Sequence, residues 1–172
     1  ENFGVSTPTT ELTKQVIDVT RPNVSFDQMT IDIYNSRVYL AGKHTWEPIT
    51  INLREDVNNN VQKLVGEQLQ KQFDFYEQSS AASGLDYKFA TRIEILDGGN
   101  GANTPTILET FELYGCYVES ANYNQLAYSA GTEPVTVTLN IRYDNAVQTP
   151  QGTGIGTAIG RTVNTLVTGG GA

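Results

Sequence analysis

Apolar and polar residues alternate along most of this chain, and a period of two is typical of strands with one buried face. Ile49, Ile51 and Leu53 point to one side and their neighbours to the other. The clearest alternation runs from Val135 to Tyr143. We expect about seven strands, with residues 37–40 continuing extended after the second. They cover residues 15–20, 28–34, 49–53, 87–96, 106–114, 125–128 and 135–143.

One segment has a helical period instead. After Asp56, apolar residues recur every three or four positions, which predicts an amphipathic helix over about residues 57–79. Asp56 is a suitable N-cap and Ser83-Gly84 a suitable stop. The stripe consists of Val57, Val61, Leu64, Val65, Leu69, Phe73 and Tyr76.

The remaining segments are turns and ends. Arg21-Pro22-Asn23 divides the first two strands, Asp97–Gly101 predicts a hairpin turn, and Gly115 interrupts a strand that restarts by Val118. Residues 1–15 lack apolar periodicity and are predicted to form an arm or loop. Residues 150–172 are rich in Gly and Thr, and we expect them to be a flexible extension that orders against a neighbour.

These elements predict one domain over residues 1–149. The fold class is mainly β, with two packed antiparallel sheets in a sandwich or partly open barrel and one flanking α-helix. At 172 residues the chain is long enough to bury a single core.

Charge and composition exclude several functions. The formal net charge is −8, from 19 acidic and 11 basic residues, which predicts poor non-specific binding to nucleic acid. An acidic surface would let DNA pass without binding it. No run of 18 apolar residues occurs, so we expect no membrane partner. The single Cys excludes a disulfide within the chain.

Candidate chemistry is sparse. His44 lies near Glu47 and Glu55, but no Ser or Cys nucleophile stands at a familiar spacing, so a surface or interface histidine is the favoured interpretation. Cys116 is flanked by aromatic residues and is expected to be a small buried hydrophobe. The glycines near the end fail the dinucleotide-binding pattern, because Ile159 stands where that pattern requires Gly. We expect no enzyme activity, no cofactor and no metal site.

Several motifs, taken in order, resemble the tail tube protein of contractile-tailed bacteriophages. The resemblance covers about residues 35–147, and its specificity comes from the ordered set rather than from any single motif. It extends more distantly to pyocin tubes and to the haemolysin-coregulated protein of type VI secretion. The matching segments are Arg37–Trp46, Ile49–Leu53 with the helix after Asp56, Asp86-Tyr87-Lys88, Phe111–Gly115, Gln125–Tyr128 and Val135–Asp144.

The resemblance implies a structural virion protein of the tail. Six subunits would close a ring, and rings would stack into the inner tube of a contractile tail, a conduit for DNA ejection. The implied partners are further copies of the chain, the tail sheath protein, and baseplate and tail terminator proteins. DNA would pass without specific binding.

The polar faces of two predicted strands are the candidate lining of the lumen, with the outer surface as the alternative. The helix is expected to face outward toward the sheath, and residues 1–15 and 150–172 are candidates for ring-to-ring contacts. The candidate lumen residues are Thr50, Asn52, Arg54, Thr136, Thr138, Asn140 and Arg142.

Two other functions stay open at this point. One is a baseplate subunit of the same fold that initiates the tube, which would differ in its copy number along the tail. The other is a monomeric β-sandwich module that binds a carbohydrate or a protein. That module would present exposed aromatic residues such as Tyr123 and Tyr128 together on one surface.

Overall fold

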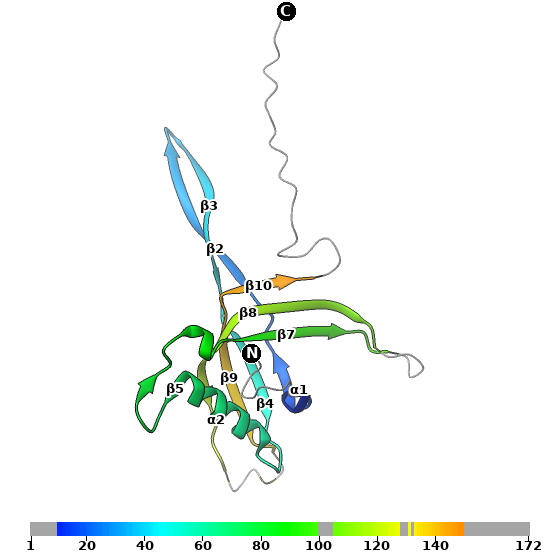
Figure 1. The fold of residues 1–172 in the computed structure, drawn as a ribbon. Coiled ribbons are helices and arrows are strands. Elements are labelled where there is room, and N and C mark those ends of the chain that lie inside the picture. The colour runs from blue at the N-terminus through cyan, green and yellow to red at the C-terminus, as the bar shows by residue number, and fades with distance from the viewer. Residues whose placement is uncertain (1–9, 100–104, 128–130, 132, 150–172) are drawn as a thin grey trace, which may run out of the picture.

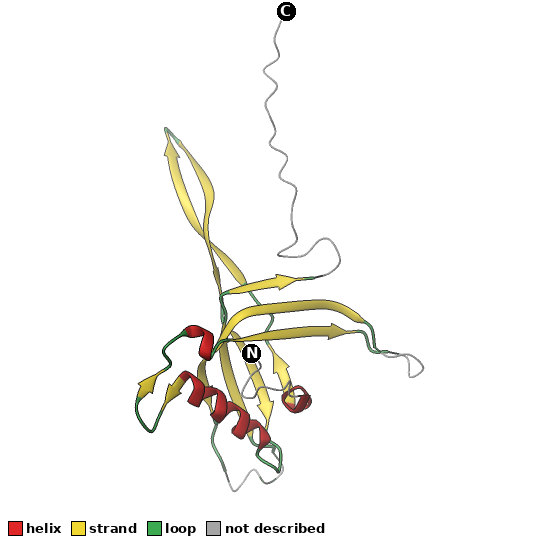
Figure 2. Cartoon of the chain, in the orientation of Figure 1, coloured by secondary structure: helices red, strands yellow, loops and turns green. Residues whose placement is uncertain are grey.

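The computed structural model describes residues 10–99, 105–127, 131 and 133–149. The chain is mainly β, as predicted, with a curled antiparallel sheet flanked by one long helix (Figures 1 and 2). Its elements are α1 Thr10–Gln15, β1 Val16–Val19, β2 Val24–Ile33, β3 Ser36–Trp46, β4 Ile49–Arg54, α2 Asn60–Gln72, β5 Phe73–Asp74, β6 Ser79–Ser80, the 3₁₀ turn Gly84–Asp86, β7 Phe89–Leu96, β8 Ile107–Asn122, β9 Thr136–Arg142 and β10 Asn145–Gln148.

The main sheet has six strands in the order β1-β4-β9-β8-β10, and β7 pairs with the other edge of β8. The two predicted sheets are two halves of this one sheet. The 16-residue β8 belongs to both halves. Its second half pairs with β9 from Tyr117 to Asn122, whereas its first half lies between β7 and β10.

The sheet changes direction at Gly115. This residue has a φ of +68°, a left-handed conformation that favours glycine. Opposite it, the chain passes from β9 to β10 at Asp144, whose N–H donates to the Tyr114 carbonyl at 3.0 Å. Lys88 Nζ donates to Asp144 Oδ2 at 2.6 Å, and this hydrogen bond raises the pKa of Lys88. Gly115 therefore bends β8 and does not end it, in contrast to the predicted break and restart.

The core lies on the inner face of the curl, under α2. The alternation predicted for β4 and β9 is confirmed, because their apolar residues are buried, except that Ile51 is partly buried. Trp46 packs against Tyr143 with 5.7 Å between ring centroids. The core consists of Trp46, Ile49, Leu53, Val61, Val65, Phe89, Leu113, Cys116, Val118, Val137, Leu139, Ile141, Tyr143 and Ala146.

The long helix exists as predicted but is shorter, because it begins at Asn60 and not at residue 57. The carboxylate of Asp56 does not cap a helix there. It accepts the N–H of Val57 at 2.7 Å, inside a turn that ends at Asn59. Asn59 has a φ of 54°, so the helix can start only after it.

The helix also ends early, at Gln72. The Gln72 amide forms two hydrogen bonds to the backbone of Val118, at 2.8 and 2.9 Å, which fixes this end of the helix to the sheet. The chain then turns extended at Phe73, and β5 pairs with β6. Ser83 was predicted to end the helix, but it caps the following 3₁₀ turn.

Other predicted segments differ in detail. Residues 10–15, predicted as part of an arm, form α1, and its Leu12 packs against the core. The predicted strand at residues 125–128 is wrong for 125–127, which are irregular, while Tyr128 lies outside the described residues. β10 was not predicted. The extension over residues 150–172 and the first nine residues also lie outside the described part of the chain.

A two-stranded hairpin projects from the sheet, and we name residues 24–46 the arm (Figure 1). Its strands β2 and β3 are longer than predicted and pair with each other. Tyr34, with a φ of 50°, lies at the tip, where the chain reverses between Ile33 and Ser36. The passage from Leu40 to Asp56 is a strand, a second strand and the approach to the helix, as the sequence indicated.

We expect Gly115→Ala to lower the free energy of unfolding by at least about 2 kcal/mol. A Cβ at this position would overlap Asp144 Oδ2, in addition to the backbone strain. Gly66→Ala is the matched control, because its Cβ meets nothing within 4 Å and Ala favours a helix by roughly 0.5–1 kcal/mol. Urea unfolding of both variants measures the difference. An unchanged midpoint for Gly115→Ala would contradict the proposed cause of the bend.

Candidate assembly surfaces

The seven candidate lumen residues lie on one face of two neighbouring strands. β4 and β9 pair antiparallel, and residues directly opposite each other share a face of the sheet. The structure thus brings together residues about 90 positions apart in the sequence. The opposite pairs are Thr50 with Asn140, Asn52 with Thr138, and Arg54 with Thr136, while Arg142 continues the same row beyond Asn140.

These side chains form a ladder of hydrogen bonds across the strands. Thr50 Oγ1 donates to Asn140 Oδ1 at 2.8 Å, and Thr138 Oγ1 donates to Asn52 Oδ1 at 2.7 Å. The Asn140 amide donates to Ser120 Oγ of β8 at 2.8 Å. The polar face is therefore an ordered network over three strands, and we name it the polar ladder.

The charged residues of the polar ladder also have partners. Arg142 Nη1 lies 3.3 Å from Glu119 Oε1, and Arg54 Nε donates to Gln15 Oε1 at 3.4 Å. The cation of Arg142 is thus paired with a carboxylate on the neighbouring strand. Arg54 has only the neutral side-chain oxygen of Gln15 as its partner, so of the two cations in the polar ladder Arg142 is the one paired with a carboxylate among the described residues.

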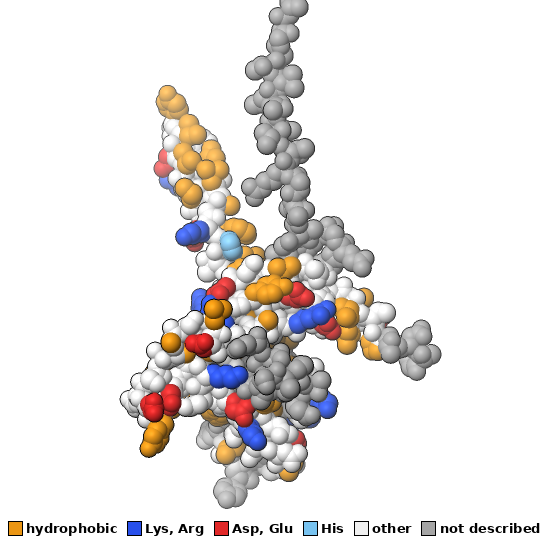
Figure 3. Space-filling model, viewed as in Figure 1, with side chains coloured by type: hydrophobic (Ala, Val, Ile, Leu, Met, Phe, Trp, Pro, Cys, Tyr) orange, Lys and Arg blue, Asp and Glu red, His pale blue; other side chains and the backbone are white. Residues whose placement is uncertain are grey.

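The arm has one apolar face that no described part of the chain covers. Met29 lies opposite Leu40 and Ile31 opposite Val38, so these four residues and Ile33 share one side of the ribbon. Their exposed fractions run from 41 to 57%. Figure 3 shows apolar side chains gathered along the arm. An isolated two-stranded ribbon is marginally stable in water, so this face is suited to packing against another surface.

The opposite side of the arm is polar. Thr30 lies opposite Tyr39 and Asp32 opposite Arg37, whose Nε donates to Asp32 Oδ1 at 2.8 Å. The alternation from Thr30 to Tyr34 predicted one apolar and one polar face. It did not reveal that the apolar face would remain exposed, because exposure depends on where the ribbon lies relative to the rest of the fold.

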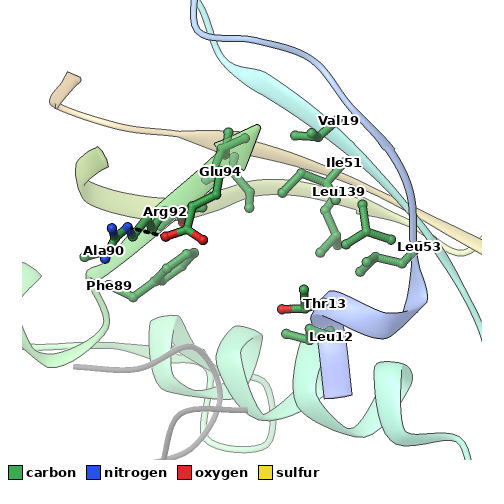
Figure 4. Close-up of a pocket in the computed structure, with 14 residues that line it drawn as sticks. Leu12, Thr13, Val19, Ile51, Leu53, Phe89, Ala90, Arg92, Glu94 and Leu139 are labelled. Atoms are coloured by element: carbon green, nitrogen blue, oxygen red, sulfur yellow. Dashed lines mark ion pairs between the residues drawn. The ribbon is translucent and has the colours of Figure 1, made fainter. Parts of the chain in front are cut away.

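In the described part of the chain the curled sheet is not closed, and strands β1 and β7 face each other across a groove. Within the described residues, β1 pairs only with β4 and β7 pairs only with β8. Figure 4 shows Val19, Ile51 and Leu139 on one side and Phe89 on the other. The groove has a volume of about 580 Å³. It is lined by Leu12, Thr13, Val16, Val19, Ile51, Leu53, residues 89–94, Leu139 and Ile141.

The groove is a feature that sequence analysis missed. Its lining is mainly aliphatic, and the ion pair of Arg92 with Glu94, at 2.8 Å, stands at its edge. Alternation in residues 87–96 indicated an apolar face for β7. Only the strand order of the folded sheet shows that β7 lies across a groove from β1, with no pairing between these two strands in the described residues.

The candidate catalytic residues do not form a site. His44 is exposed on β3, with its ring 6.3 Å from that of Phe26, and within the described residues no hydrogen bond or ion pair joins it to Glu47 or Glu55. Glu55 instead accepts the N–H of Gln62 at 3.2 Å. The interpretation of His44 as a surface histidine is confirmed for this chain.

Cys116 is fully buried, as the sequence indicated. Its S–H donates to the Leu113 carbonyl at 3.4 Å, and burial raises the pKa of the thiol. A raised pKa disfavours the reactive thiolate. Across the part of the chain that the structure describes, no group of three or more His, Cys, Asp and Glu residues could hold a metal ion. Over the same residues, no helix has the length and apolar character to cross a membrane.

No protein-family model and no curated protein sequence matches this chain. Solved structures do resemble it. A chain in the sheath/tube terminator of the extracellular contractile injection system PVC, in its extended state, gives a TM-score of 0.59 at 12% identity, covering 78% of this chain and 85% of that chain.

Two further structures show the same likeness. A chain in the PVC sheath–tube complex gives a TM-score of 0.56 at 12% identity, covering 78% of this chain and 80% of that chain. A chain in the baseplate of the anti-feeding prophage gives 0.57 at 10% identity, covering 76 and 78%. At such identities the likeness concerns the fold. This chain has the fold of the tube proteins of contractile injection systems.

Proposed function

We propose that this protein is a structural, non-enzymatic subunit that assembles into hexameric rings, and that the rings stack into a tube. One observation carries the proposal: a domain with a tube-protein fold presents an arm whose apolar face is exposed. Large exposed apolar faces mark surfaces that pack against partners. Because a tube is built from many copies of one subunit, we propose that the partner of this surface is another copy of the same chain.

The energetics favour association through the arm. Full burial of a large apolar side chain contributes about 1.5–3 kcal/mol, and the arm carries five such residues near half exposure. Part of this gain offsets the loss of translational and rotational freedom on association. If the arm packs against the body of a neighbour, the contact joins two different surfaces and is heterologous, and a repeated heterologous contact with the right rotation closes a ring.

The more specific proposal is the inner tail tube of a contractile phage tail, through which DNA is ejected. The resemblance of residues 35–147 to phage tail tube proteins supports it, together with a net charge of −8. The polar ladder supports a lumen role, because its amides and hydroxyls bond to one another and its Arg142 is paired. We propose that all seven ladder residues line the lumen of the virion tail.

The exposed side of α2 is proposed to face the sheath protein, and baseplate and terminator proteins are proposed to contact the two ends of the tube. These partners agree with the assemblies in which the similar chains were solved, which include a sheath–tube complex, a terminator and a baseplate. The contacts of this chain with each partner are part of the proposal.

A second candidate function is a baseplate subunit that initiates the tube. The TM-score of 0.57 to a chain in the anti-feeding prophage baseplate favours it. The two functions differ in copy number, because an initiator forms one or two rings per tail and a tube protein forms many. Quantifying this chain against a baseplate component in purified tails separates them.

We expect Ile31→Asp to prevent assembly without unfolding the domain. The substitution places a charge in the centre of the apolar face of the arm, where assembly would bury it at high cost. Thr30→Asp is the matched control, with the same charge one residue away on the polar face. Negative-stain electron microscopy and sedimentation velocity measure assembly, and circular dichroism measures folding.

The expected result is rings or tubes for the wild type and Thr30→Asp, and monomers with an unchanged spectrum for Ile31→Asp. Equal assembly of the two variants would contradict the role of the apolar face. A wild-type chain that stays monomeric at high concentration would contradict the tube function itself and favour the monomeric binding module. Of that module's two expected tyrosines, Tyr123 is exposed, and Tyr128 lies outside the described residues.

The lumen proposal has its own test. Thr138→Cys places a thiol of similar size in the polar ladder, and Lys63→Cys places one on the exposed side of α2. Buried Cys116 should stay unlabelled. After reaction with a maleimide-linked gold cluster, averaged images of tubes should show density inside for Thr138→Cys and outside for Lys63→Cys. Density outside for Thr138→Cys would show that the ladder faces the outer surface.

A further inference from the structure

We propose that the arm of one copy places its apolar face over the groove between β1 and β7 of the next copy. This inference rests on the proposed function, since it names the surface that receives the arm. Arm and groove would then form one heterologous contact that repeats around a ring.

The shape and lining of the groove suit the binding of an extended polypeptide segment. Val16 and Val19 of β1 lie on one side and Ile93 of β7 on the other, above a buried floor that includes Leu139 and Ile141. Val16 is 40% exposed. An aliphatic groove between two strands admits apolar side chains that project from a β-ribbon, spaced at every second residue.

The strands that flank the groove also have unpaired edges. Each of β1 and β7 pairs on one side only within the described residues. Their outer N–H and C=O groups form a template for another strand. β2 and β3 pair only with each other in that same part of the chain, so each has a free edge as well. The addition of a strand to an exposed edge is a common mode of recognition, with backbone hydrogen bonds for affinity and side-chain pockets for specificity.

The arm meets these requirements on the apolar side. Met29, Ile31 and Ile33 project from β2 with a spacing of two, and Val38 and Leu40 project from β3 on the same face. The arm extends away from the body of its own chain, whereas the groove lies within the body beside α1 (Figures 1 and 4). A second copy is therefore the source of the arm that fills a given groove. The polar side of the arm, with the Asp32–Arg37 ion pair, stays in solvent.

Two segments outside the described residues are competing occupants. Residues 1–9 lead into α1, whose Leu12 lines the groove, but they contain only Phe3 and Val5 as large apolar residues. In residues 150–172, Ile155, Ile159, Val163 and Leu166 are spaced by three or four and not by two. The arm has more apolar side chains in strand spacing than either segment, which is why we assign the groove to it.

Disulfide trapping between two different chains tests the assignment. One full-length chain carries Ile31→Cys, and a second, marked by a size tag, carries Ile93→Cys in the groove. After assembly of the mixture and mild oxidation, the expected product is a heterotypic dimer, at least tenfold above that with Lys63→Cys in place of Ile93→Cys. Val16→Cys is a second groove position, on the opposite side, in case Ile93→Cys impairs folding. Electron microscopy first confirms that each single variant assembles.

The outcomes separate the two proposals. Tubes in which the Ile31→Cys chain links to neither groove position overturn the arm–groove contact and leave the tube function standing. The same holds if a groove thiol links instead to Val5→Cys or Val163→Cys, which would assign the groove to a terminal segment. Failure of the wild-type chain to form any ring or tube overturns the proposed function, and with it this inference.

Discussion

The rest of the structure depends on a β-sheet that curls around a core without closing. Curling brings the apolar faces of β4 and β9 against α2 and against β8, which buries enough side chains for a folded domain. Within the described residues β1 and β7 do not pair with each other, so the same curl leaves an unpaired edge on each of these strands and an apolar groove between them. A sealed barrel would have neither. The open edges are what make association with identical copies a physical expectation for this domain.

The bend in β8 sets the shape of that sheet. Gly115 permits a left-handed backbone, and Asp144, held by Lys88, occupies the space where any side chain would stand. Before the bend, β8 pairs with β7 and β10, and β7 forms the far wall of the groove. The arm leaves from the other half of the fold, between β1 and β4 in chain order. The groove lies in the body of the fold and the arm projects away from that body, so the proposed contact would join two different surfaces of the subunit head to tail.

Much of this fold could be predicted from the sequence, because the burial of alternate residues in a strand is visible in the local sequence pattern. Alternation in residues 49–53 and 135–143 reports burial of one face, and both strands lie where it indicated. The polar residues that alternate with the buried ones in these two strands lie on the opposite face of the sheet and form the polar ladder. Helix bounds were less accurate, because the end at Gln72 depends on hydrogen bonds to Val118, 46 residues away.

The assembly surfaces were harder to predict for a similar reason. Ile31 in the arm and Ile93 beside the groove stand in patterns that also fit strands of a closed core. Whether such a face is covered depends on strand order and on which strands are terminal, and neither property is local. β10 was not predicted, because its four residues, Asn145–Gln148, are too few to show a clear alternation of apolar and polar side chains.

Amide hydrogen exchange, compared between the monomer and the assembled form, tests the central claim most directly. If identical copies complete the open sheet, the amides of β2, β3 and the outer edges of β1 and β7 should exchange quickly in the monomer and become protected on assembly. Amides of β9, which is paired on both sides in the single chain, should be protected in both states. Equal exchange of the arm and the edge strands in the two states would contradict the account.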